Sequence, residues 1–304
     1  MSLQYSSAPT TGYPLLGNGR YRVCYPLVDI AKRPFAVFLA DDLHTDQQVI
    51  IKQINRLEPP CSLTMQEKKA ILRREETFLR RVQHDRIASL LETIVDGDQY
   101  ALVLPFFSGT PLEKELLQRA APGPQHYGQA AVINCGLALC HLLHYLHTLN
   151  PPIIHRDIKP GNIVHCLDGS CALVDLGNAR YYDSHREHLR WQPNNDTLPG
   201  IGTPGYCPPE QYGINGTPPR TTPVTDLYSV GAILYQMVTG YNPGLKPIGE
   251  RFHYPPPIPY VTSGGISDDL AILIMELLEW KPERRPRSAS EVIQRLEHMR
   301  ALLP

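Results

Sequence analysis

The sequence predicts an α+β fold with two lobes: a small β-rich lobe with one main helix, followed by a larger, mainly helical lobe. Short runs rich in β-branched and aromatic residues crowd the first third of the chain. Longer segments with a helical spacing of apolar residues fill the remainder. The chain has 304 residues, of which 42% are hydrophobic, so it can bury a sizeable core.

The small lobe is assigned to residues 16–106, after a flexible tail at residues 1–15 that is rich in Ser, Thr and Pro. A helical segment is expected at residues 65–84, and a hairpin at residues 90–106 that turns at residues 96–98. The strands expected before that helix are residues 21–27, 36–40 and 49–54.

The larger lobe is assigned to residues 107–304, and its pattern is helical from Leu112 onward. The segment at residues 130–149 is almost wholly apolar, which predicts a buried helix. No apolar run approaches the ~20 residues that a membrane helix needs, so no membrane span is expected. Further helices are expected at residues 226–240, 268–280 and 289–303.

Charge and cysteine content narrow the class of protein. The formal net charge is -1, which gives no electrostatic reason to expect binding to nucleic acid or a membrane surface. The N-terminus lacks the basic and apolar regions of a signal peptide, and the seven cysteines are dispersed without a CxxC pair. We therefore expect a cytoplasmic protein with reduced thiols and no zinc site. His141, His144 and His147 lie on an apolar helix without acidic neighbours, so no metal site is expected there.

The stretch IIHRDIKPGNIV, at residues 153–164, concentrates functional side chains on one loop. The sequence after it predicts a hairpin that turns at residues 168–169 and brings Asp175 back beside Asp157. Two carboxylates and the amide oxygen of Asn162 would then converge. Such a set of hard oxygen donors suits Mg²⁺ bound together with substrate phosphates.

These segments resemble the signature motifs of the protein kinase family. The resemblance covers residues 16–300 in the expected order and has the character of the eukaryotic-like Ser/Thr kinases of bacteria. It implies a two-lobed protein-kinase-like fold, ATP and Mg²⁺ as cofactors, and phosphoryl transfer to Ser or Thr of a protein, including autophosphorylation. The motifs are VIIK (49–52), HRDIKPGN (155–162), DLG (175–177), GTPGYCPPEQY (202–212), DLYSVG (226–231) and Arg285 in KPERRPRS.

The resemblance assigns the catalytic chemistry to the HRDIKPGN and DLG motifs. Asp157 would orient the substrate hydroxyl or accept its proton, and Lys159 would neutralise charge on the transferring phosphoryl group. Asn162 and Asp175 would hold Mg²⁺. A lysine two residues after the catalytic acid is typical of Ser/Thr kinases.

The nucleotide-binding positions follow from the same resemblance. Lys52 would contact the α- and β-phosphates and pair with Glu75. We prefer Glu75 to its neighbour Glu76 because it lies nine residues before His84. The remaining positions are Val37 over the adenine, Leu104 as the gatekeeper and Phe106 in the hinge.

The resemblance also places a substrate-binding loop and a regulatory segment. Thr203 would hydrogen-bond the catalytic acid, and Glu210 belongs to the same loop. Thr197 lies six residues before Thr203, within a long polar segment at residues 178–202 that we expect to be mobile and autophosphorylated. Its phosphate would pair with Arg156; the alternative for Arg156 is a simple surface charge.

The sequence departs from the family at the glycine-rich loop that covers the ATP phosphates. The three glycine positions are occupied by Ile30, Lys32 and Phe35, so backbone N–H groups cannot approach phosphate as closely. Lys32 and Arg33 would offset part of that loss. The GNG at residues 17–19 precedes the first predicted strand and does not replace the loop.

Two alternatives remain open. A pseudokinase scaffold would bind nucleotide weakly or turn it over little or not at all. A small-molecule kinase of the aminoglycoside type would share the Asp–Asn–Asp set, but such enzymes usually lack a loop like Thr203–Glu210. The preferred interpretation is a Ser/Thr protein kinase without nucleic-acid or membrane partners, with a transient homodimer as one route to autophosphorylation.

Overall fold

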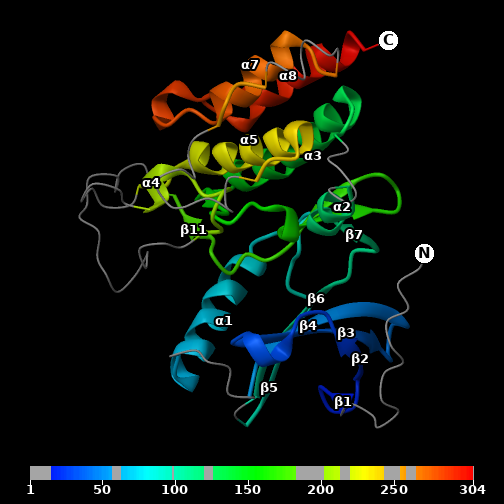
Figure 1. The fold of residues 1–304 in the computed structure, drawn as a ribbon. Coiled ribbons are helices and arrows are strands. Elements are labelled where there is room, and N and C mark those ends of the chain that lie inside the picture. The colour runs from blue at the N-terminus through cyan, green and yellow to red at the C-terminus, as the bar shows by residue number, and fades with distance from the viewer. Residues whose placement is uncertain are drawn as a thin grey trace. The chain divides into compact units, whose positions relative to one another are not determined.

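The computed structural model describes residues 15–56, 63–97, 99–119, 126–182, 202–212, 220–242, 254–257 and 265–303. The chain divides into two compact units, Met1–Phe107 and Ser108–Pro304, and each is described by itself. The first unit contains a β-sheet with one long helix, and the second is mainly helical (Figure 1). This content confirms the predicted α+β class, with a small β-rich part and a larger helical part.

The first unit contains a six-stranded antiparallel sheet in the order β1-β2-β3-β4-β6-β5. Alternate residues of its strands, such as Phe38, Ile51 and Val103, pack together in one buried apolar cluster. The predicted strands and hairpin are therefore present. The strands are β1 (Leu15–Leu16), β2 (Tyr21–Pro26), β3 (Phe35–Asp42), β4 (Gln47–Ile54), β5 (Glu92–Asp96) and β6 (Gln99–Pro105).

Helix α1 (Met65–Leu79) begins at a capping box. The Thr64 hydroxyl accepts a hydrogen bond from the backbone N–H of Glu67, whose carboxylate accepts one from the backbone N–H of Thr64. The buried side chains of α1 include Leu72 and Glu75. The helix ends five residues before the predicted end at residue 84.

The short strand β1 is missing from the sequence-based prediction. Leu15 pairs with Arg22, and Leu16 pairs with Tyr21. All three residues at 17–19 between these pairs have positive φ, a conformation that glycine and asparagine adopt readily. The expectation that GNG precedes the first strand is therefore wrong, because GNG forms the turn of the β1–β2 hairpin.

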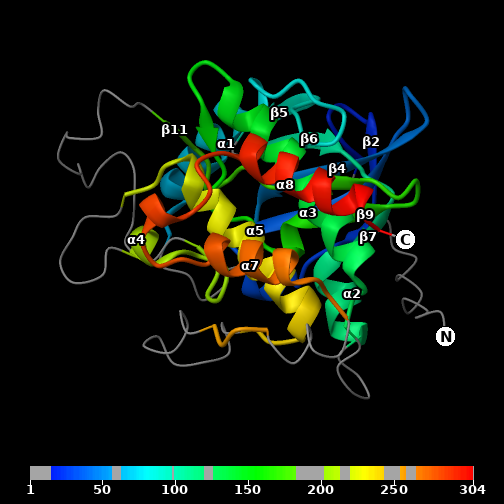
Figure 2. The ribbon, with the colours of Figure 1, turned by 90° about the horizontal axis from the view of Figure 1, so that it is seen from above.

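Long helices stack in the second unit. Helix α3 packs against α5 and α8, and α5 packs against α7, as both views show (Figures 1 and 2). Helix α5 begins at a capping box between Thr222 and Thr225, and Gly240, with a left-handed φ of 68°, caps its C-terminal end. These helices are α3 (Gln129–Thr148), α5 (Pro223–Thr239), α7 (Asp268–Leu277) and α8 (Ala289–Ala301).

Short strands carry the loops of the second unit. Strand β9 pairs with β7 and β10, and β8 pairs with β11. The predicted hairpin is β9–β10, which turns at residues 168–169. A Cβ atom on Gly109 would lie 2.0 Å from the carbonyl oxygen of His165, so only glycine fits where β7 meets β9. The elements are β7 (Gly109–Pro111), α2 (Leu112–Arg119), β8 (Ile153–Ile154), η2 (Pro160–Asn162), β9 (Ile163–Cys166), β10 (Cys171–Leu173), β11 (Arg180–Tyr181), α4 (Pro209–Tyr212) and η7 (Pro282–Arg284).

Helix α3 is long and apolar enough to cross a membrane, judged by length and composition alone. The sequence-based statement that no apolar run approaches this length is therefore wrong. Within its most apolar window, 56% of the helix is buried inside the structure. Burial of this kind is typical of the core helix of a globular unit, and the predicted burial of the helix is confirmed.

We predict that two glycine-to-alanine substitutions in helix interiors differ in their effect on stability. A Cβ atom on Gly231 of α5 would lie 2.6 Å from Cβ of Leu277, which cannot move without α7. A Cβ atom on Gly136 of α3 meets only the methyl ends of Leu234 and Leu296, which can rotate. Both variants gain the same helix propensity from alanine. The free energy of unfolding in urea should therefore be about 1–3 kcal/mol lower for Gly231→Ala than for Gly136→Ala. Equal unfolding free energies would contradict the close packing of α5 on α7.

Candidate active site

An ion pair joins the sheet and the helix of the first unit. The Lys52 ammonium on β4 lies 2.8 Å from Oε1 and 2.7 Å from Oε2 of Glu75 on α1. The Glu75 side chain is fully buried, whereas that of Lys52 is 13% exposed. Glu76, the alternative that the sequence offered, instead accepts hydrogen bonds from Arg80 and Thr93. The structure therefore pairs Lys52 with Glu75, whereas Glu76 binds other side chains.

The loop between β2 and β3 forms a 3₁₀ turn, η1 (Ile30–Lys32), where the kinase family has glycines. The Asp29 carboxylate caps the turn by accepting a hydrogen bond from the backbone N–H of Ala31. The side-chain amide of Asn55 donates to the carbonyl oxygens of Ile30 (2.5 Å) and Arg33 (2.8 Å). Ile30 also packs against the apolar cluster of the sheet. Hydrogen bonds and packing therefore fix this loop.

The other expected nucleotide-binding positions also lie on the first unit. Val37 is half-buried on β3 and is paired directly with Lys52 across the sheet. Leu104 is buried on β6, and Phe106 is half-buried just after that strand. Phe35 occupies the last of the three positions that are glycine in the kinase motif. It begins β3, and its ring centre lies 6.0 Å from the Lys52 ammonium.

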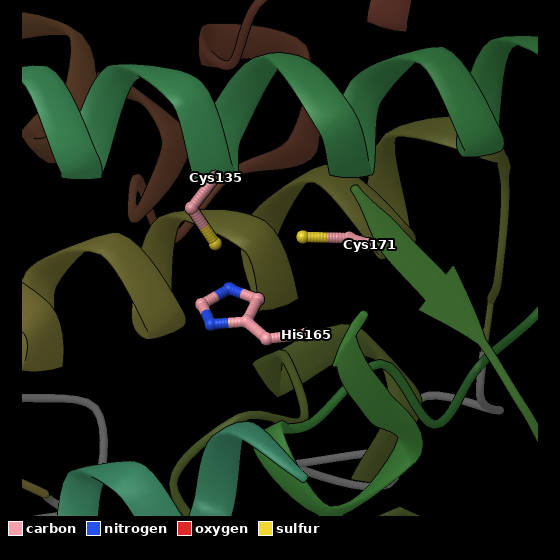
Figure 3. Close-up of side chains that lie close together, drawn as sticks. All are labelled: Cys135, His165 and Cys171. Atoms are coloured by element: carbon pink, nitrogen blue, oxygen red, sulfur yellow. The ribbon is translucent and has the colours of Figure 1, made fainter. Parts of the chain in front are cut away.

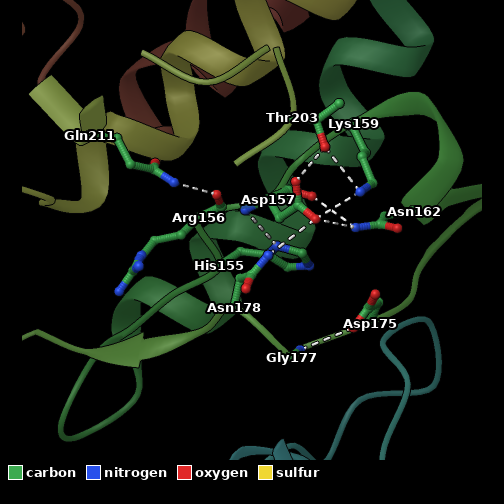
Figure 4. A network of polar contacts seen from close by, with 10 residues as sticks. All are labelled: His155, Arg156, Asp157, Lys159, Asn162, Asp175, Gly177, Asn178, Thr203 and Gln211. Atoms are coloured by element: carbon green, nitrogen blue, oxygen red, sulfur yellow. Dashed lines mark hydrogen bonds and ion pairs between the residues drawn. The ribbon is translucent and has the colours of Figure 1, made fainter. Parts of the chain in front are cut away.

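In the second unit, three side chains close a triangle of hydrogen bonds (Figure 4). The Thr203 hydroxyl donates to Oδ1 of Asp157 at 2.8 Å. The Lys159 ammonium donates to Oδ2 of Asp157 at 2.8 Å and lies 3.0 Å from the Thr203 hydroxyl. Asn178 adds an amide hydrogen bond to Oδ2 of Asp157, at 3.3 Å. The sequence pointed to the first three residues but gave no signal for Asn178.

The loop that carries Asp157 is anchored to a buried carboxylate. Asp226, in the first turn of α5, accepts hydrogen bonds from the backbone N–H groups of His155 (2.9 Å) and Arg156 (2.8 Å). Nε2 of His147 on α3 lies 2.9 Å from the same carboxylate. Arg156 has a φ of +68°, which is uncommon for a residue other than glycine. His155 is fully buried, and its Nδ1 accepts a hydrogen bond from the backbone N–H of Asp157, a structural role.

The electrostatics of Asp226 explain how a carboxylate can lie there. Burial acts to raise its pKa, but the hydrogen bond from His147 and the neighbouring backbone N–H groups outweigh burial and hold the pKa below its ordinary value. The expectation that His147 has no acidic company is therefore wrong. The partner is 79 residues away in the sequence, so the local pattern could not show it.

Figure 4 also draws the side chains of Asn162 and Asp175, the two expected Mg²⁺ ligands, with the hydrogen-bonded triangle. The side-chain amide of Asn162 donates to the backbone carbonyl of Asp157 at 2.9 Å, which leaves Oδ1 as its oxygen donor for a cation. The backbone N–H of Val174 donates to the carbonyl of Asn162 at 2.9 Å, so Asp175 follows directly beside it. Oδ1 of Asp175 accepts from the backbone N–H of Gly177 at 3.0 Å. A carboxylate and an amide oxygen fit the requirements of Mg²⁺.

The segment 202–212 is tied to the rest of the second unit by two further contacts. Glu210 and Arg285 form a bidentate ion pair at 2.7 and 2.8 Å, with the Arg285 side chain fully buried and its guanidinium 4.8 Å from the centre of the Tyr228 ring. The side-chain amide of Gln211 donates to the carbonyl of Arg156 at 2.8 Å. The sequence did not single out Gln211.

The structure describes only one of the two residues that were expected to regulate the protein, Arg156 and Thr197. Arg156 is only 2% exposed, so the alternative of a simple surface charge is wrong. Thr197 lies outside the residues that the structure describes, and its phosphorylation stays a prediction.

Comparison with known proteins gives a consistent result. A family model described as the protein kinase domain matches residues 35–296. Serine/threonine-protein kinase PkaB of Streptomyces coelicolor is 28% identical over 97% of this chain, which spans 63% of the length of PkaB. Mouse serine/threonine-protein kinase tousled-like 2 and the DNA damage-responsive serine/threonine-protein kinase RqkA of Deinococcus radiodurans are each 28% identical over 75% of the chain. The aligned part covers only 30% and 32% of those two proteins.

We predict that Asp226→Asn destabilises the protein in a pH-dependent way. The substitution leaves two loop N–H groups and His147 without their buried anion, which should lower the free energy of unfolding by about 3–5 kcal/mol at pH 7. Because the folded-state pKa is depressed, this contribution is complete above the ordinary aspartate pKa of about 3.9 and is lost as pH falls through the folded-state value. Urea unfolding of both proteins at pH 7 and at successively lower pH, down to about pH 2 and so below the ordinary aspartate pKa, measures it.

The matched control is Asp85→Asn, because the Asp85 side chain is 84% exposed and should be nearly neutral. The account of Asp226 would be contradicted if the parent and Asp226→Asn differed little in free energy of unfolding at pH 7. A difference that grows as pH falls would also contradict it.

Proposed function

Because this chain belongs to the protein kinase family, we propose that it transfers the γ-phosphoryl group of Mg·ATP to a serine or threonine of a protein. The observation that carries this proposal is the closed set of hydrogen bonds among Asp157, Lys159 and Thr203. A fixed carboxylate with a neighbouring ammonium is what alignment of a hydroxyl against a phosphoryl group requires. The relatives that match are named serine/threonine-protein kinases, which supports the same substrate class.

In this mechanism, the Asp157 carboxylate orients the substrate hydroxyl and accepts its proton as the phosphoryl group moves. The Lys159 ammonium, which already lies against Asp157, neutralises charge on the transferring group. Asn162 and Asp175 would hold Mg²⁺. When bound, that ion would supply positive charge that offsets the negative charge on the phosphates.

The first unit would supply the nucleotide contacts. Glu75 fixes the Lys52 ammonium through both carboxylate oxygens, so the ammonium would meet the α- and β-phosphates in one position. Val37 and Leu104 would contact the adenine, and the backbone around Phe106 would hydrogen-bond its edge. Each is an apolar residue on a rigid strand or next to one, which suits a planar aromatic ligand.

Autophosphorylation and regulation belong to the same proposal. Phosphate on Thr197 would add about −1.5 to −2 charges, and the guanidinium of Arg156 is its proposed partner. A transient homodimer would let one chain phosphorylate another. A reduced cytoplasmic setting suits the described cysteines, all of which are free thiols.

The pseudokinase remains the second candidate because of one specific observation. The β2–β3 loop has no glycine, so its side chains would keep its backbone N–H groups further from phosphate than those of a glycine-rich loop. If the parent protein shows no thermal shift at millimolar Mg·ATP, the pseudokinase becomes the better interpretation. Loss of the catalytic residues themselves gives no support to it, because Lys52, Asp157 and Asp175 are all present.

We predict that Asp157→Asn lowers phosphate incorporation from labelled Mg·ATP roughly 10²–10⁴-fold, the contribution of a positioned acid–base group. Nucleotide binding and the thermal unfolding midpoint should change little. Mass spectrometry of the active parent should find phosphate on Thr197. The control is Asp168→Asn, an exposed acid at the tip of the β9–β10 hairpin, which should keep full activity. Equal incorporation by parent and Asp157→Asn would exclude the proposed mechanism.

We also predict that Asn55→Ala raises the KM for ATP while turnover at saturating ATP stays the same. The amide of Asn55 makes two hydrogen bonds to the loop, and their loss lets the loop sample other conformations that binding must then order. A net contribution of about 0.5–1.5 kcal/mol corresponds to a roughly two- to twelvefold rise in KM. Gln48→Ala, at an exposed position of β4, is the control. An unchanged KM would show that the fixed loop takes no part in nucleotide binding.

A further inference from the structure

Four polar or thiol side chains gather in the second unit, apart from the proposed catalytic residues. Glu115 lies on α2, Cys135 on α3, His165 on β9 and Cys171 on β10. One ligand atom each from Cys135, His165 and Cys171 lies within 4.8 Å of the other two. Figure 3 shows the two sulfur atoms and the imidazole ring pointing toward one another.

The fold itself creates this convergence. His165 and Cys171 are directly opposite each other in the antiparallel register of β9 and β10, so their side chains emerge on the same face of the hairpin. Helix α3 packs against β10 and carries Cys135. Both cysteines are buried, at 3% and 5% exposure, while the His165 side chain is 27% exposed. The cluster is therefore held by regular elements and reachable along the histidine.

A second observation concerns the orientation of the imidazole. Nδ1 of His165 lies 2.9 Å from Oε2 of Glu115, and the Tyr127 hydroxyl donates to that same oxygen at 3.2 Å. A carboxylate at Nδ1 favours a proton on that nitrogen, which makes Nε2 the ring nitrogen that can bind a metal. In Figure 3 the ring nitrogen nearer the sulfur atoms is the one not next to the attached carbon, Nε2. A carboxylate behind a histidine is the usual support of metal-bound histidine.

We propose that Cys135, Cys171 and His165 bind a thiophilic divalent cation, Zn²⁺, and that Glu115 orients the imidazole. Two sulfurs and one imidazole nitrogen suit Zn²⁺ and do not suit Mg²⁺ or Ca²⁺, which take oxygen ligands. A tetrahedral zinc ion separates such ligand atoms by about 3.5–3.8 Å, given its ordinary bond lengths. That separation is inside the 4.8 Å limit met here. Two thiolates also neutralise the ion, which makes its burial acceptable.

The site would act on the hairpin that carries the proposed Mg²⁺ ligands. His165 follows Asn162 by three residues, and Cys171 precedes Asp175 by four. A metal that joins α3, β9 and β10 would hold both strands of this hairpin against helix α3. The inference is one of structural support, and it stands whether or not the chain proves to be an active kinase.

The experiment uses the full chain, reduced, stripped with a chelator and desalted. Zn²⁺ is added, and retained metal is measured by elemental analysis after gel filtration. Co²⁺ is the spectroscopic probe, because thiolate ligation produces a sulfur-to-cobalt charge-transfer band. We expect one equivalent of metal per chain, and a higher thermal unfolding midpoint with Zn²⁺ than without it.

Variants separate a metal site from packed thiols. Cys171→Ala and His165→Ala should each weaken binding at least tenfold, and Glu115→Gln should weaken it about 10–100-fold, as for other supporting residues. Cys140→Ala is the matched control, since Cys140 is a buried cysteine of the same helix outside the cluster. It should bind as the parent does. Unfolding of each metal-free variant checks that the loss is not one of folding.

Three results would overturn the proposal. The parent could retain no Zn²⁺ at micromolar free metal. The double variant Cys135→Ala with Cys171→Ala could retain as much as the parent. Finally, mass spectrometry of the reduced protein could find both thiols alkylated as readily with Zn²⁺ as without it, which would show that neither sulfur binds the metal.

Discussion

The buried carboxylate of Asp226 is the interaction on which the second unit depends. Three donors from two distant segments meet on it: the backbone N–H groups of His155 and Arg156, and the imidazole of His147. The left-handed backbone at Arg156 is unfavourable by itself and persists only where its surroundings fix it. The position of Asp157, one residue further on, follows from that constraint. A surface ion pair could not replace it, because only a desolvated anion holds backbone groups this firmly.

The same loop is held from its other side. The carbonyl of Arg156 accepts a hydrogen bond from Gln211, and Thr203 reaches Asp157 from the same segment. That segment is in turn tied down by the buried ion pair of Glu210 with Arg285. The proposed base and the proposed substrate loop are therefore parts of one network. A change in either is expected to displace the other, which is why single deletions within such a network do not report independent contributions.

The sequence predicted those features that depend on local pattern. Apolar spacing identified α3, α5, α7 and α8, and the spacing to His84 pointed to Glu75, whose contact with Lys52 the structure contains. Features that depend on tertiary contact were missed. The two-residue strand β1 has no pattern of its own, and the partner of His147 is 79 residues away. Cys135, His165 and Cys171 have no ligand-like spacing, because they meet through strand register and helix packing.

The first unit shows how a loop can lose its glycines without losing its order. Asp29 and Asn55 satisfy the polar groups of the η1 turn, and Ile30 anchors it in the apolar cluster. A glycine-rich loop approaches phosphate closely but must be ordered when it binds, which costs conformational entropy. The turn observed here is ordered beforehand, which would reduce that cost, while side chains at the glycine positions would keep the backbone further from a bound phosphate. The two effects oppose each other, and two lost charge-assisted hydrogen bonds, at about 1.5–3 kcal/mol each, would outweigh a backbone ordering cost of about 1–2 kcal/mol for one residue. If the chain binds ATP as proposed, weak nucleotide binding is therefore the expected result.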